Sequence, residues 1–154
     1  MPASNDEIRE LIGNSCVALN VEDYAEFLAL CGPDFRYRLL AYSPEIGAEM
    51  TWMNYDRGGL ETLFADMPHH LHVPLGSLFR HVSTYAIGPG DASGEASAKS
   101  SVLIVFTDES GVSKLFAAGC YHDVVNVSGR RPLLVSRTMR LETRDIGVGT
   151  PIPL

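Results

Sequence analysis

Two histidines and one aspartate are the residues of this sequence best suited to general acid–base chemistry. His122 and Asp123 are neighbours, and His81 lies in a run of alternating residues at 77–87. Because neighbouring residues of a strand point to opposite faces, His122 and Asp123 cannot form a mutual acid–base pair. His81 shares a face with Phe79 and Tyr85, and this aromatic face is the one predicted to point inward.

An inward His81 would have two candidate partners. A His81–Asp123 or His81–Tyr37 pair across a concave interior would orient a general base in the usual way. The other interpretation is a core histidine whose hydrogen bonds are satisfied and which has no catalytic role. Both interpretations remain open from the sequence alone.

Three further histidines raise the question of a metal site. His69, His70 and His72 lie within four residues, and three imidazoles are able to bind zinc or iron. An extended chain places His70 and His72 on one side and His69 on the other, which is a poor ligand set. No nearby carboxylate offers a fourth ligand or a supporting contact. We therefore expect a polar loop and no metal in this chain.

The cysteines and the known sequence motifs point to no other chemistry. Cys16, Cys31 and Cys120 are odd in number and form no CxxC pair, so neither a disulfide framework nor a zinc knuckle is predicted. The chain has no P-loop, dinucleotide-binding GxGxxG, GxSxG or HExxH motif. It also lacks the paired Cys and His motifs of a Rieske iron–sulfur centre, so we expect any such cofactor in another chain.

The segments that must position these residues begin with two helices. Ser4 and Glu7 form a capping-box pattern, and apolar residues follow at helical spacing as far as Leu19. Asn20 is predicted to cap a second helix, which ends at Gly32-Pro33.

Strands dominate the rest of the chain. From Asp34 the pattern alternates with a period of two, and residues 49–55, with Trp52, form a second strand. Asp56 caps a short third helix that ends at Pro68. The remaining predicted strands cover residues 77–87, 98–107, 112–127 and 132–143. The third of these is long for one strand and contains Gly119, so a bend or bulge is expected.

This order of elements predicts an α+β fold in a single domain, residues 1–154. Helices segregated to one side of a curved antiparallel sheet leave a concave interior, where a small ligand could bind. Tyr37, Trp52, His81, His122 and Asp123 are the candidate residues for such a cavity. The tail, residues 145–154, is rich in Gly and Pro and is expected to extend over a neighbouring surface.

Composition restricts the classes of function. The 154 residues are 45% hydrophobic and 20% charged, with a net charge of −7, which argues against disorder, nucleic-acid binding and an anionic membrane surface. There is no apolar run of membrane-spanning length and no signal peptide, so we expect a cytoplasmic protein. Arginines gather in residues 130–144, which suggests either a subunit contact or a solvated strand face. The interface candidates are Arg137, Arg140 and Arg144.

Several segments resemble a known family. The element order is similar to that of the NTF2-like (cystatin-like) α+β cone, a curved sheet with about three helices packed on it. Within that superfamily the chain resembles the small (β) subunit of Rieske-type aromatic-ring-hydroxylating oxygenases. The segments that carry the resemblance are DYAEFL at 23–28, FRYR at 35–38, LFRHVS at 78–83 and SRTMRLETRDIGVGT at 136–150. With EMTW at 49–52, the last segment resembles in particular the hydroxylase small subunit of methanesulfonate monooxygenases.

The resemblance implies a partner and a structural role. It implies a larger α subunit that carries a Rieske [2Fe–2S] cluster and a mononuclear Fe(II), and an α3β3 assembly. In that family the β subunit is mainly structural, so no catalytic residue and no cofactor are expected here. The chain is short for such subunits, and if isolated it is expected to form a homo-oligomer, a dimer or a trimer.

Other cone-shaped relatives suggest an alternative function. They include stand-alone isomerases, dehydratases and cyclases that use a buried His or Asp on a small hydrophobic substrate, as well as proteins that only bind a ligand. A stand-alone enzyme needs an open, dry cavity with His81 or Asp123 reaching into it, whereas a structural subunit can fill its interior with side chains. The structure of the interior therefore separates the two functions.

Overall fold

The structure is a computed structural model that describes residues 2–67, 76–147, 149–150 and 152–154. Within these residues the chain forms α1 (Asn5–Asn20), α2 (Tyr24–Ala29), β1 (Cys31–Ser43), β2 (Ala48–Asp56), α3 (Arg57–Asp66), β3 (Gly76–Pro89), β4 (Glu95–Asp108), β5 (Ser113–Asn126) and β6 (Leu133–Leu141).

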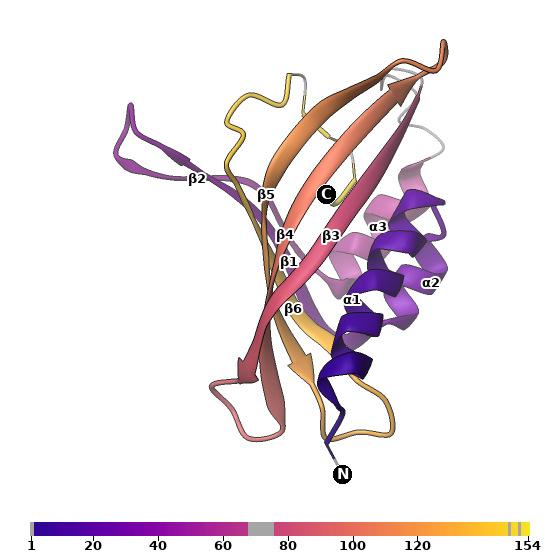
Figure 1. The fold of residues 1–154 in the computed structure, drawn as a ribbon, viewed down its shortest axis with the longest axis vertical. Helices are drawn as coiled ribbons and strands as arrows, with labels where there is room; N and C mark the ends of the chain where they lie inside the picture. Colours follow the sequence, from indigo (N-terminus) through magenta and orange to yellow (C-terminus); the bar gives the residue numbers. More distant parts are fainter. Residues whose placement is uncertain (1, 68–75, 148, 151) are drawn as a thin grey trace.

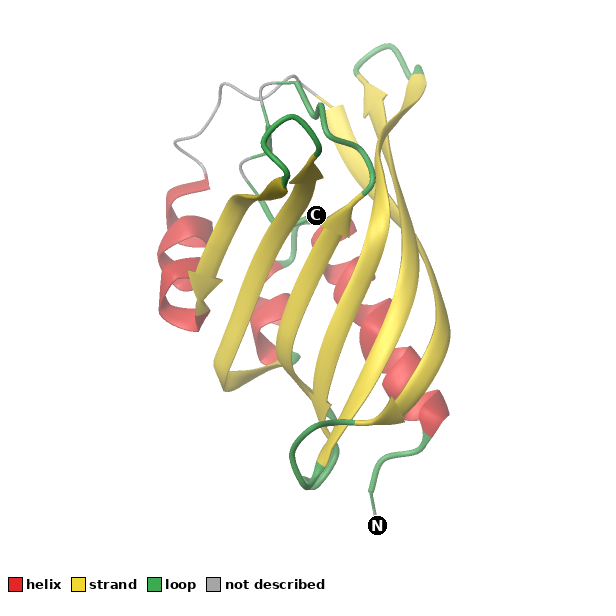
Figure 2. Cartoon of the chain, turned by 90° about the vertical axis from the view of Figure 1, so that its left-hand side faces the viewer, coloured by secondary structure: helices red, strands yellow, loops and turns green. Residues whose placement is uncertain are grey.

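The strands form one curved, mixed sheet with the order β2-β1-β6-β5-β4-β3 (Figure 1). Each neighbouring pair is antiparallel except β1 and β6, which run parallel, and the last strand lies between β1 and β5. The three helices lie together on one face of the sheet, as Figure 2 shows from the opposite side. We call the helix-facing side the inner face and the other side the outer face. This arrangement confirms the predicted α+β cone.

Helix α1 begins as predicted. The Ser4 hydroxyl accepts a hydrogen bond from the Glu7 amide (3.2 Å), and the Glu7 carboxylate accepts one from the Ser4 amide (2.7 Å). This reciprocal pair satisfies two amides that the first helical turn leaves free. The side chains that α1 buries repeat at helical spacing and pack on the sheet: Ile8, Leu11, Ile12, Ser15, Cys16, Ala18 and Leu19.

The predicted start of the second helix is wrong. Helix α1 continues through Asn20, and α2 is capped by Asp23, whose carboxylate accepts from the Glu26 amide (3.1 Å). The Asn20 side chain instead reaches β3 and accepts from both the backbone amide and the guanidinium of Arg80. A tertiary contact has therefore taken the side chain that the local pattern assigned to a cap.

The predicted end of α2 is also corrected. The helix ends at Ala29, and Gly32 lies inside strand β1. The chain joins the sheet early because the Leu134 amide donates to the Leu30 carbonyl (2.9 Å) and Cys31 pairs with Leu134. Helix α3, in contrast, begins as predicted, with the Asp56 carboxylate accepting from the Gly59 amide (2.7 Å).

Bulges change which side of a long strand faces inward. The β3–β4 register shifts between Thr84 and Ala86, so Tyr85 has no partner on β4. An extra residue reverses the alternation beyond it. Arg80, Val82 and Thr84 face inward before the bulge, and Ile87 packs on the core after it. A second register shift, between Ile104 and Val105 of β4, leaves Phe116 of β5 without a partner. It confirms the irregularity expected in this long strand, at Phe116 rather than at Gly119.

The tail does not extend over a neighbouring surface as expected. Its described residues fold back, and Ile146, Ile152 and Leu154 are buried. Leu154 enters the space between the sheet and the helices, where it is fully buried and packs in the main hydrophobic core. The end of the chain is thus part of the interior that the cone encloses.

Candidate functional site in the cone interior

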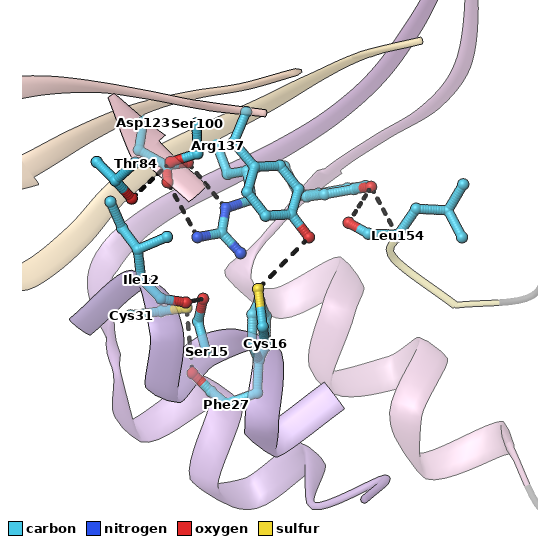
Figure 3. Close-up of polar contacts among 12 residues, drawn as sticks. Ile12, Ser15, Cys16, Phe27, Cys31, Thr84, Ser100, Asp123, Arg137 and Leu154 are labelled. Carbon is cyan, nitrogen blue, oxygen red and sulfur yellow. Dashed lines mark hydrogen bonds and ion pairs between the residues drawn. The ribbon is translucent and has the colours of Figure 1, made fainter. Parts of the chain in front are cut away.

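The centre of the inner face is a buried ion pair that joins two strands. Arg137 of β6 lies between Tyr37 of β1 and Asp123 of β5, which are its direct neighbours in the sheet. Its guanidinium donates to both carboxylate oxygens of Asp123, from Nε to Oδ1 (2.8 Å) and from Nη2 to Oδ2 (3.0 Å) (Figure 3). Neither side chain has any exposed surface. The pair is bidentate, which is the geometry that best compensates two charges withdrawn from water.

An aromatic ring and a thiol complete the surroundings of this pair. The guanidinium carbon of Arg137 lies 3.9 Å from the centre of the Tyr121 ring, a cation–π contact. The Cys16 thiol of α1 points at the Tyr121 hydroxyl from 3.9 Å. Burial alone would lower the pKa of Arg137, but the Asp123 carboxylate reverses this, and the net shift is upward. Arg137 is therefore a permanent cation, and Asp123 is its counterion.

Tyr37 connects the sheet to the tail. Its hydroxyl accepts a hydrogen bond from the Leu154 amide (2.9 Å) and donates one to the Leu154 carbonyl (3.3 Å). Burial raises the pKa of Tyr37 to about 12, so the phenol is neutral at physiological pH. It can donate and accept hydrogen bonds, but it is not a base.

Arg80 of β3 is the second buried guanidinium. Only 3% of its surface is exposed. Nη1 donates to the Asn20 side-chain oxygen (3.1 Å) and Nη2 to the Pro153 carbonyl (2.6 Å). Among the described residues, Arg80 Nε and Arg137 Nη1 have no hydrogen-bond partner although both are buried. The interior is therefore polar at its centre and richer in donors than in acceptors.

The structure brings together only two of the five residues predicted to line a cavity. Tyr37 and Asp123 lie in the interior, where they flank Arg137 on its two neighbouring strands. Trp52 lies on the edge strand β2 and is 41% exposed. His122 lies on the outer face opposite Lys99 of β4, and burial together with that lysine lowers its pKa.

The prediction that His81 faces inward is wrong. His81 is exposed on the outer face, beside Phe79, with 5.0 Å between the ring centres. The aromatic side chains of 79–87 predict an inward His81, but the bulge at Tyr85 puts the core residue Ile87 in phase with Arg80, and Arg80 is the buried one. The His81–Asp123 and His81–Tyr37 pairs therefore do not form, and Asp123 pairs with Arg137 instead.

The three arginines predicted to lie at an interface differ in their exposure. Arg137 does not lie on the surface, because it is the buried partner of Asp123. Arg140 and Arg144 are half-exposed, and each forms an ion pair with a glutamate of the β1–β2 hairpin: Arg140 with Glu49 and Arg144 with Glu45 (2.9 Å). Whether these two arginines contact a partner remains a prediction.

The remaining sequence predictions concern metals and membranes. His69, His70 and His72 lie outside the described residues. In the part of the chain that the structure describes, no group of three or more His, Cys, Asp or Glu side chains could hold a metal ion. Among the described helices, none is both long and apolar enough to cross a membrane.

Sequence reasoning missed Arg80, Tyr121, Arg137 and Leu154 as parts of one network. One pattern could have revealed Arg137, because it is in phase with Met139 and Leu141, both of which face the core. Tyr121 is likewise in phase with Asp123 on β5. No local pattern predicts the position of Leu154, since it depends on a contact between residues 117 positions apart.

The polar groups of this arrangement hold the fold together and leave no free base. The one buried side-chain carboxylate among the described residues is paired with Arg137, and the Tyr37 and Tyr121 hydroxyls are held neutral by burial. A free general base needs an unpaired acceptor within reach of a substrate, and no described side chain of the interior offers one. Leu154 of the same chain is buried in the described interior.

Two known proteins are similar to this chain over nearly its whole length. The β subunit of the methanesulfonate monooxygenase hydroxylase of Methylosulfonomonas methylovora is 32% identical over 160 residues, which cover 97% of this chain and 86% of that protein. The β subunit of 2-aminobenzenesulfonate 2,3-dioxygenase of an Alcaligenes species is 30% identical, over 96% of this chain and 97% of that protein. The chain belongs to the family of oxygenase small (β) subunits. No protein-family model matches it.

Solved structures of oxygenases contain the same fold. A chain of naphthalene 1,2-dioxygenase superposes with a TM-score of 0.79 at 14% identity, covering 97% of this chain and 84% of that one. The β subunit of benzoate 1,2-dioxygenase from Burkholderia mallei superposes with a TM-score of 0.72 at 12% identity, over 92% and 93% of the two chains. This oxygenase β subunit therefore shares the curved-sheet α+β fold of those two chains.

Proposed function

We propose that this chain is the structural small subunit of a Rieske-type non-haem iron oxygenase, in which it assembles with a catalytic α subunit and stabilises it. The observation that carries the proposal is the end-to-end similarity to two oxygenase β subunits. The described interior agrees with it, because its one buried side-chain carboxylate is committed to Arg137 and Leu154 is buried there. A stand-alone isomerase, dehydratase or cyclase would need that space for its substrate.

The proposal places the redox chemistry in the partner. The α subunit would carry the Rieske [2Fe–2S] cluster and the mononuclear Fe(II), and the two subunits would form an α3β3 hexamer in the cytoplasm. The names of both relatives refer to sulfonates, methanesulfonate in one case and 2-aminobenzenesulfonate in the other. We therefore infer that the partner hydroxylates an organosulfonate, aliphatic or aromatic.

The outer face of the sheet offers a surface for this assembly. Phe79, His81, Leu103, Val105 and Leu115 form what we call the outer-face patch. Cross-strand pairs join them, Phe79 with Val105, Val105 with Leu115, and His81 with Leu103. Leu103 is 50% exposed and Leu115 is 63% exposed. No described helix covers this face, and contiguous exposed apolar side chains are typical of interaction sites.

Copurification tests the proposal directly. The tagged chain is purified from its native cell, and the proteins that accompany it are identified by mass spectrometry, sized as a complex and analysed for iron. We expect a stoichiometric partner of about 45–50 kDa, a chain of two or three domains, that contains iron. A chain that elutes without a partner, or that converts a substrate by itself, would contradict the proposal.

A pair of variants tests the outer-face patch in the same experiment. Leu103→Glu places a charge within the patch and is expected to abolish recovery of the partner, because an unpaired charge in an interface is costly to bury. Val17→Glu is the matched control, since Val17 is an equally exposed apolar residue of α1. Loss of the partner from both variants, or from neither, would show that the patch is not the contact surface.

A further inference from the structure

Arg80 presents a pair of donors of which only one is used. The Nε and Nη2 groups of an arginine lie on the same side of the guanidinium and match the two oxygens of one oxyanion. Arg137 uses this pair in full, on both oxygens of Asp123. In Arg80, Nη2 donates to the Pro153 carbonyl (2.6 Å), and Nε has no partner among the described residues. A single carbonyl oxygen thus stands where a two-oxygen group would fit.

No side-chain carboxylate of the described interior is free to pair with Arg80. The charged side chains that are buried there are Arg80, Arg137 and Asp123, and the carboxylate is committed to Arg137. The acceptors of Arg80 are the neutral oxygens of Asn20 and Pro153. A guanidinium donor that is buried without an acceptor is costly, so a second oxygen at Nε would be favourable.

The two side chains that hold the tail lie on the inner face, on strands toward opposite edges of the sheet. Arg80 lies on β3 and Tyr37 on β1, yet both bind residues 153–154, Arg80 through Pro153 and Tyr37 through Leu154. These polar contacts use only backbone atoms of the tail. The side chain of Leu154 fills apolar space, with no surface exposed. The tail therefore combines a polar group at Arg80 and Tyr37 with an apolar body, as a small amphiphilic ligand does.

We propose that Arg80 and Tyr37 form an interior binding site for a small organic oxyanion, a carboxylate or sulfonate with an apolar body, and that residues 153–154 occupy this site in the structure. The oxyanion would take both Nε and Nη2 of Arg80 and a hydrogen bond from the Tyr37 hydroxyl. Its apolar body would replace the Leu154 side chain. This site does not depend on the oxygenase partner, so its test is separate from that of the proposed function.

Calorimetric titration of the full-length chain with benzenesulfonate tests the site. Benzenesulfonamide, which has nearly the same shape but no charge, is the control ligand. Because the tail competes with the ligand, Leu154→Ala should strengthen benzenesulfonate binding by about tenfold, since it removes most of the buried side chain of the competitor. Benzenesulfonamide should bind at least about tenfold more weakly to the same variant, because it lacks the charge that Arg80 recognises.

A second substitution isolates the donor pair. In the Leu154→Ala background, Arg80→Lys retains the positive charge and loses the paired donors, so affinity should fall by about tenfold. The matched control is Arg140→Lys, an exposed arginine for which no change is expected. Should Arg80→Lys fail to fold, nuclear magnetic resonance of the unmodified chain decides, because benzenesulfonate should shift the Leu154 amide, which donates to Tyr37.

Three results would overturn the inference. The first is equal binding of the sulfonate and the sulfonamide, which would indicate an apolar cavity without anion recognition. The second is unchanged affinity in Arg80→Lys. The third is the absence of benzenesulfonate binding and of a Leu154 amide shift, which would leave a buried water on Nε as the remaining explanation.

Discussion

The buried pair of Arg137 and Asp123 is the residue-scale feature on which the interior depends. Asp123→Asn keeps the size of the side chain but leaves the Arg137 charge without a counterion. Removing one partner of a buried pair costs about 3–5 kcal/mol, so we expect a loss of this order in the free energy of unfolding, measured with urea. The matched control is Glu45→Gln, which breaks the exposed pair with Arg144 and should cost less than about 1 kcal/mol.

A double substitution shows whether the charge or the shape of the pair matters. Replacing both partners, with Arg137→Met and Asp123→Leu, removes both charges and keeps apolar volume. Buried pairs replaced in this way are often as stable as the original. We therefore expect the double variant to be more stable than Asp123→Asn alone. If it is less stable, the hydrogen bonds and the Tyr121 contact outweigh the uncompensated charge.

Tyr37 makes stability depend on alkaline pH. Its pKa rises from 10.0 to about 12 on folding. Between these values the folded chain holds a proton that the unfolded chain has lost, so stability falls as pH rises, by up to about 1.4 kcal/mol per pH unit. Tyr37→Phe loses the bonds to Leu154, about 1 kcal/mol at pH 8, but does not titrate.

The measurement is urea unfolding of the wild-type chain and Tyr37→Phe at pH 8, 10 and 11.5. The advantage of the wild type should shrink between pH 10 and 11.5, because only the wild type has Tyr37 to ionise. Cys31, whose pKa burial also raises to about 12, is present in both proteins and cancels in the comparison. A difference that stays constant with pH would show that Tyr37 ionises as easily in the folded chain as in the unfolded one.

At the scale of the elements, Gly119 marks a place where two strands of the sheet lie too close together for a side chain. Gly119 lies on β5 opposite Leu141 of β6, where an added Cβ would overlap the Arg140 carbonyl oxygen and lie 3.0 Å from its carbon. Because backbone must move to make room, Gly119→Ala should destabilise the chain by about 1–3 kcal/mol.

Gly13→Ala is the matched control in helix α1. No atom lies within 4 Å of an added Cβ there, and alanine is the better helix former. We expect a gain of about 0.5–1 kcal/mol. Thermal unfolding of both variants gives the comparison, and a destabilising Gly13→Ala or a neutral Gly119→Ala would contradict the packing described here.

The elements also show what the sequence could predict. Helices, most strands and the caps of α1 and α3 follow local patterns, because a cap or an alternation involves residues a few positions apart. The inner face of β3 could not be predicted in this way, since one extra residue at Tyr85 reverses the alternation. The same limit applies to Asn20, a good cap by type that instead binds Arg80, 60 positions away.

At the scale of the whole molecule, the burial of several side chains is the opposite of what their residue types suggest. The aromatic and histidine side chains of β3 are exposed, while arginines from β3 and β6 are buried. Residue type alone favours the opposite, because arginine is mostly exposed. Only the complete sheet, which places Tyr37, Arg137 and Asp123 side by side on three strands, makes a buried guanidinium acceptable. The candidate site is thus a product of topology rather than of a motif.

The outer-face patch leads to the last prediction, which concerns the isolated chain. Leu103 and Leu115 expose apolar surface on a sheet face that no described helix covers, and such a surface favours self-association in water. We expect the purified chain to form a dimer or trimer in sedimentation velocity experiments at micromolar concentration. Leu103→Glu with Leu115→Glu should give a monomer, because two carboxylates would have to be buried in the contact. Val17→Glu with Val21→Glu, on α1 and at its end, should leave the oligomer intact. If that control dissociates and the outer-face variant does not, the oligomer forms through the helices, and the outer face is free for the catalytic partner.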